Sequence, residues 1–95
     1  MEVLQPKELD THPGAEIVSW ARDQLSIARS ILDNPGGGLL FAAQTIGQVH
    51  AALHERDASR WGDAVALLMR AEDAAVHREF DTARRLVDEA AGIIG

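Results

Sequence analysis

Two histidines and one glutamate are the residues with the most suggestive chemistry. His50 and His54 are four residues apart, so on a helix their imidazoles share one side, as in metal sites built on a helical histidine pair. Glu72 is a conceivable third ligand, because it falls at the centre of an apolar stripe, where a carboxylate is rarely left unpaired. The favoured interpretation is structural: Glu72 and His50 form a buried polar pair, or Glu72 meets Gln24 or a helix cap. A Glu72 that reaches solvent is the second interpretation, and a metal or catalytic site is the third.

No other chemical motif in the sequence is complete. Three consecutive glycines at 36–38 precede a predicted helix, but no strand comes before them and no Lys-Ser or Lys-Thr pair follows, so the phosphate-loop signature fails. No Ser has a His and an acid at a spacing that suggests nucleophilic catalysis. We therefore expect no catalytic residues, no metal ion and no cofactor.

The elements that carry these residues are predicted to be helices. The clearest is residues 15–33, where apolar side chains fill one half of the helical circumference and polar ones nearly all of the other half. The apolar half consists of Ile17, Val18, Trp20, Ala21, Leu25, Ile27, Ala28, Ile31 and Leu32. A helix with so wide an apolar side must be buried against several neighbours, which indicates a helical bundle.

The whole chain is predicted to be all-α, a small antiparallel four-helix bundle with a flexible N-terminal arm. The arm is residues 1–12 and the bundle residues 13–95, with helices at about 14–33, 38–56, 60–77 and 81–93. Pro35 and the glycines after it end the first helix. The other connections are short, and short connections make successive helices antiparallel. The apolar stripes of the last two helices are predicted to end in Val76 and Ile93.

A second surface of residues 38–56 is a candidate for partner binding. It lies opposite the core stripe of that helix and comprises Leu40, Phe41, Thr45, Gln48 and Ala52. A large aromatic beside Leu40 and small residues would suit a docking patch for another protein or for a second copy of the chain. The alternative is that residues 14–33 or the N-terminal arm cover this side.

One family resemblance leads to an enzymatic alternative. It is carried by two stretches, Trp20-Ala21-Arg22-Asp23-Gln24-Leu25 with Ala28 and Ile31-Leu32, and Phe41-Ala42-Ala43-Gln44 leading to Ala51-Ala52-Leu53. Together they resemble the first helix pair of HEPN domains. The resemblance implies an all-helical, dimeric ribonuclease or toxin component with an Arg-x(4–6)-His motif at the dimer interface. Arg70 and His77, with six residues between them, match that motif, although Ala71 stands where the family often has a polar residue.

Composition sets the limits on function. The net charge of −6 argues against binding to nucleic acid or to an anionic membrane. The chain has no Cys and no apolar stretch long enough to span a membrane, so we expect a cytoplasmic protein. Its basic residues are nearly all Arg, and it is rich in Ala and Gly, which indicates a high-GC bacterium or its phage. The favoured function is a non-enzymatic protein-binding module, with another protein or a second copy as partner; if a phage encodes the chain, we expect it to act on a host protein.

Overall fold

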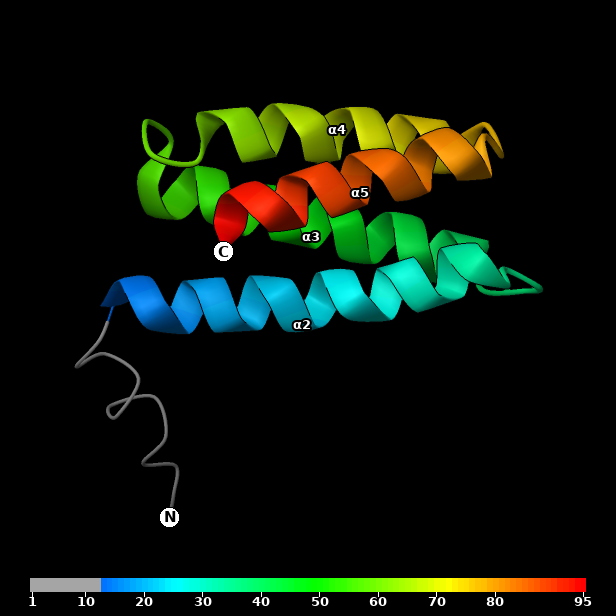
Figure 1. Ribbon diagram of the computed structural model, residues 1–95, viewed down its shortest axis with the longest axis horizontal. Helices are drawn as coiled ribbons and strands as arrows, with labels where there is room; N and C mark the ends of the chain where they lie inside the picture. The colour runs from blue at the N-terminus through cyan, green and yellow to red at the C-terminus, as the bar shows by residue number, and fades with distance from the viewer. Residues whose placement is uncertain (1–12) are drawn as a thin grey trace, which may run out of the picture.

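Four α-helices make up the part of the chain that the structure describes. The computed structural model describes residues 13–95, with helices α2 (Pro13–Asp33), α3 (Leu39–Asp57), α4 (Gly62–Val76) and α5 (Phe80–Ile94) (Figure 1). The predicted all-α, antiparallel four-helix bundle is confirmed. The predicted arm, residues 1–12, lies outside the described residues.

The helices form a closed ring in which each packs against two others. α3 lies between α2 and α4, and α5 closes the ring by packing on both α4 and α2. Successive helices run in opposite directions, and the chain ends near the start of α2 (Figure 1). Each helix therefore has two neighbours to bury its apolar side against, and its remaining surface faces solvent.

The turns explain where the helices begin and end. α2 ends at Asp33 because Pro35 disfavours helical geometry at the residue before it. α4 begins two residues later than predicted, because Arg60 N–H donates to the Asp57 carboxylate (3.0 Å) and holds a separate turn. α4 ends in a turn in which Glu79 N–H donates to Ala74 O (2.8 Å) and Arg78 has a left-handed φ of 62°. This arrangement is the Schellman motif, in which glycine is the usual left-handed residue.

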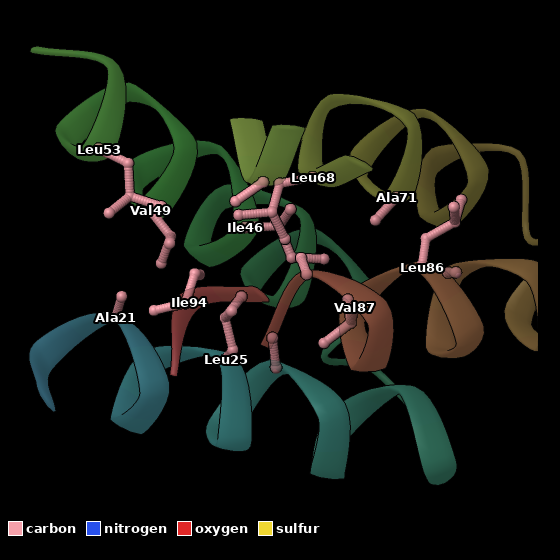
Figure 2. Packing of buried hydrophobic residues seen from close by; sticks show 14 of the residues in the cluster. Ala21, Leu25, Ile46, Val49, Leu53, Leu68, Ala71, Leu86, Val87 and Ile94 are labelled. Atoms are coloured by element: carbon pink, nitrogen blue, oxygen red, sulfur yellow. The ribbon is translucent and has the colours of Figure 1, made fainter. Parts of the chain in front are cut away.

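The core combines a few branched side chains with many alanines. The large, fully buried side chains are Leu25, Leu32, Ile46, Leu53, Leu68, Leu86, Val49 and Val87. Figure 2 labels all of these except Leu32, and they point between the helices toward the centre of the ring. Ala21, Ala28, Ala42, Ala64, Ala71, Ala75, Ala83 and Ala90 are also completely buried. Alanine lets helices approach closely but removes little apolar area from water, so the core is thin for its length.

Four residues predicted to be in the core are in contact with solvent. Trp20 is 36% exposed, Ile27 45%, Val76 58% and Ile93 48%, so these four predictions were wrong. Trp20 and Ile27 lie on the edge of the wide apolar arc of α2, part of which its two neighbouring helices leave uncovered, and Val76 and Ile93 lie in the last turns of α4 and α5. At the end of α5 the residue that enters the core is instead Ile94.

Candidate binding surface

The predicted partner-binding set divides into exposed and covered residues. Leu40 is 69% exposed and Phe41 56%, and Gln48 is also exposed. Thr45 is only 3% exposed and its hydroxyl donates to Phe41 O (2.8 Å), while Ala52 is half-buried against the core. Placing Thr45 on an open surface was therefore wrong, since it is buried, whereas the half-buried Ala52 still lines a surface depression.

Two exposed residues of α2, Trp20 and Ile27, belong to the apolar half of that helix. Trp20 and Ile27 are separated by two helical turns and so share one side of α2, as Phe41 and Gln48 do on α3. Trp20 and Gln48 line one shallow depression between the two helices, together with Ala51, Ala52, His54 and Glu55. We call Trp20, Ile27, Phe41 and Gln48 the α2–α3 surface. Leu40 precedes Phe41 directly and therefore points about 100° away from it, off this surface.

One signal in the sequence indicated that part of the apolar arc of α2 would stay exposed. The apolar arc of α2 is wider than one helix interface requires, and a bundle of four helices gives each helix two neighbours. Some residues at its edges therefore had to remain in solvent. The sequence could not show which edge, because the helical period defines the centre of an arc and not the angle at which a neighbour approaches.

The side of α2 that faces away from α3 is joined to α5 by charged side chains. Arg29 Nε donates to the Asp88 carboxylate of α5 (2.9 Å), and this hydrogen bond is the main reason that the pKa of Arg29 is raised. Arg84 of α5 donates to Leu32 O (3.1 Å) at the end of α2 and lies 3.8 Å from the Asp33 carboxylate. Polar bonds thus join α2 to α5, whereas the α2–α3 surface presents large apolar side chains to water.

His50 and Glu72 meet at the junction of α3 and α4. His50 Nε2–H donates to Glu72 Oε1 at 2.7 Å, so the structure contains the expected contact. The expected burial was wrong, because the side chains are 19% and 38% exposed. Gly47 lies beneath this pair, and a Cβ added there would stand 3.1 Å from Glu72 Oε2. The carboxylate therefore rests over the one position of α3 without a side chain.

The metal interpretation finds no geometric support. His54 is exposed and outside the His50–Glu72 contact. Among residues that the structure describes, no group of three or more His, Asp or Glu side chains is arranged to hold a metal ion. The His50–Glu72 pair is best explained as a polar contact that fixes the register of α3 against α4.

The two residues of the enzymatic alternative are both exposed: Arg70 lies within α4, and His77 directly follows its last residue. His77 Nδ1–H donates to Asp73 O (2.8 Å) and lies 3.5 Å from the Asp73 carboxylate. This backbone bond, and secondly the charge of Asp73, raises the pKa of His77. Arg70 and Asp73 also line a shallow hollow between α4 and α5, next to Glu79. A composite site of the HEPN kind would require this side of α4 to meet a second copy.

Comparison with known proteins gives no family for this chain. No family model matches it, and no curated protein or solved structure has significant similarity to it. Within residues 13–95, none of the helices has the length and apolar character required to cross a membrane.

Proposed function

We propose that this protein is a small, non-enzymatic protein-binding module and that its partner docks on the α2–α3 surface. The observation that carries the proposal is the exposure of Trp20, Ile27 and Phe41 on two adjacent helices, in a protein with little apolar area to spare for its core. Exposed single apolar residues are ordinary, but several on one surface, including two aromatics, are typical of an interface.

The character of the residues around them supports the same proposal. Gln24 and Gln48 are neutral side chains that can exchange hydrogen bonds with water for bonds with a partner. Interface centres are depleted in charge and enriched in aromatic residues, and a few such anchors supply most of the binding energy. An origin in a phage of a high-GC bacterium would make a host protein the natural partner of such a module.

The experiment is photo-crosslinking in the producing cell. A benzophenone amino acid replaces Phe41 in one variant and Ile93, a similarly exposed residue of α5, in a matched control. We expect the variant at position 41 to give an adduct heavier than one chain and the control to give none. An adduct only at position 93 would contradict the proposal, and so would a crosslink from position 41 to residues 1–12 of the same chain.

A ribonuclease is the second candidate function. It is favoured by one observation, the bond from His77 to Asp73, which orients an imidazole of raised pKa on the helix that carries Arg70. Such a histidine can transfer protons near neutral pH. RNA cleavage by the purified protein that disappears in both Arg70→Ala and His77→Ala would establish this function instead.

A further inference from the structure

The charges around the α2–α3 surface have one predominant sign. Asp23 is one turn from both Trp20 and Ile27 on α2, and Glu16 is one turn before Trp20. On α3, Glu55 lines the same depression as Trp20. Carboxylates therefore flank the Trp20 end of this surface.

The arginines of α2 are turned away from this surface. Arg29 binds Asp88 of α5. The aliphatic part of Arg22 lies beside the C-terminal Gly95, where an added Cβ would stand 3.2 Å from Arg22 Cδ, although Arg22 also lines one hollow with Asp23. On α3, His54 lines the depression itself, and Arg56 lines a neighbouring hollow together with Ile17 and Glu55. The outer surface of α2 next to α3 thus retains acidic side chains, in a chain whose net charge is −6.

The shape of this surface suits a helix. α2 and α3 lie side by side and antiparallel and meet along a seam (Figure 1). Trp20 and Ile27, two turns apart on α2, are exposed on the side next to α3. A helix laid along such a seam contacts it with residues at i, i+3 or i+4, and i+7. A second copy of this chain would bring the same carboxylates, and a nucleic acid or an anionic membrane would be repelled by them.

We infer that the partner presents a basic amphipathic helix, which lies along the α2–α3 seam. Its apolar side contacts Ile27 and Phe41, and its Lys or Arg residues lie at the Trp20 end, close to Asp23 and Glu55. This inference rests on the proposed function and specifies the chemistry of the partner. Opposite charges at the rim of an interface select the partner and accelerate association, and salt weakens their effect.

The test uses two designed peptides and the full chain. Each peptide is a helix of about 18 residues, about 27 Å long, with leucines on one side; one carries lysines beside the leucines and the other carries glutamates in their place. Binding is followed by two-dimensional NMR, and the Trp61 indole, 3% exposed, serves as internal reference for the Trp20 indole, 36% exposed. We expect the lysine peptide to change the chemical shifts of Trp20 and of the other residues of the α2–α3 surface and to leave the chemical shift of Trp61 unchanged. At low salt it should bind at least about tenfold more tightly than the glutamate peptide.

Matched variants separate specific from general attraction. Asp23→Asn with Glu55→Gln should weaken binding of the lysine peptide about three- to tenfold, whereas Asp63→Asn with Glu79→Gln, an equal change in net charge, should leave it unchanged. An equal loss in both double variants would overturn the inference. Ile27→Asp should abolish the shifts at Trp20, and Ile93→Asp should not.

Several outcomes would overturn the partner chemistry without overturning the proposed function. Equal binding of both peptides at the α2–α3 surface would remove the preference for a basic helix. Signals of this surface that move with protein concentration alone would make a second copy the occupant. If neither peptide binds at millimolar concentration while the crosslink from position 41 to a partner persists, the surface binds protein of another kind. Failure of that crosslink, in contrast, would overturn the proposed function itself.

Discussion

Replacing Gly47 with alanine should stabilise the protein less than a helix-interior Gly→Ala change normally does. In the middle of a helix, alanine is favoured over glycine by about 1 kcal/mol. At this position the new Cβ would stand 3.1 Å from Glu72 Oε2 and 3.4 Å from its Cδ, so the side chain must shift by a few tenths of an ångström. That shift lengthens the 2.7 Å contact with His50, a partly exposed pair worth about 0.5–1 kcal/mol.

The weakening of the His50–Glu72 contact should therefore offset most of the stability gained by replacing glycine with alanine. We expect Gly47→Ala to change the free energy of unfolding by about 0–0.5 kcal/mol in the natural chain and to add about 1 kcal/mol when Glu72 is already alanine. The assay is urea denaturation at pH 7 of both single variants, the double variant and the natural chain, compared by midpoint at a common slope. In the same series Glu72→Gln should be tolerated better than Glu72→Ala, because an amide can still hydrogen-bond to His50.

Gly92 provides the control for this cycle. It lies within α5, and apart from its chain neighbours and the backbone of its own helix no atom lies within 4 Å of an added Cβ, so Gly92→Ala should give the same gain whether residue 72 is Glu or Ala. An equal gain of about 1 kcal/mol from Gly47→Ala in both backgrounds would refute the reasoning. It would mean that the carboxylate is not held over Gly47.

Three further predictions concern α4 and the turn that follows it. Arg78→Gly should stabilise the protein by about 1 kcal/mol, because Arg78 has a φ of 62°, a left-handed conformation that glycine adopts without strain; an unchanged or lower thermal midpoint would count against it. Folding raises the pKa of His77, so the protonated His77 should stabilise the protein fully below about pH 6.5, and this stabilisation should be lost as the pH rises through the raised pKa of the folded state. His77→Gln should remove this part of the pH dependence of the thermal midpoint. A dependence that survives the substitution would exclude His77 as its source. Purified protein should not cleave RNA, and cleavage abolished by both Arg70→Ala and His77→Ala would show that the enzymatic alternative is correct.

The helices themselves could be predicted because each one carries a local signal. The 3.6-residue period of Leu25, Ala28 and Leu32 marks a helix without any knowledge of its neighbours, and Pro35 marks its end. The start of α4 was misplaced because the bond from Arg60 N–H to Asp57 extends a turn that propensity alone does not reveal.

The candidate surface could be predicted only in part, because exposure depends on how neighbouring helices approach. Phe41 was identified from its position opposite the core stripe of its own helix. Trp20 and Ile27 were missed, because the period places them on the apolar side of α2 and says nothing of where α3 meets that side. The burial of Glu72 was overestimated for the same reason, although its position in the apolar stripe of its helix did indicate His50 as its partner.

The most direct test of the central claim compares two residues of nearly equal exposure. Phe41 on α3 is 56% exposed and Met69 on α4 is 55% exposed, so alanine removes a similar apolar side chain from water in each case. With the partner identified by crosslinking, we predict that Phe41→Ala weakens its binding by about 1–3 kcal/mol and Met69→Ala leaves it unchanged, both with natural thermal midpoints. An unchanged affinity in Phe41→Ala, or a lower midpoint with no loss of binding, would contradict the assignment of the α2–α3 surface as the binding site.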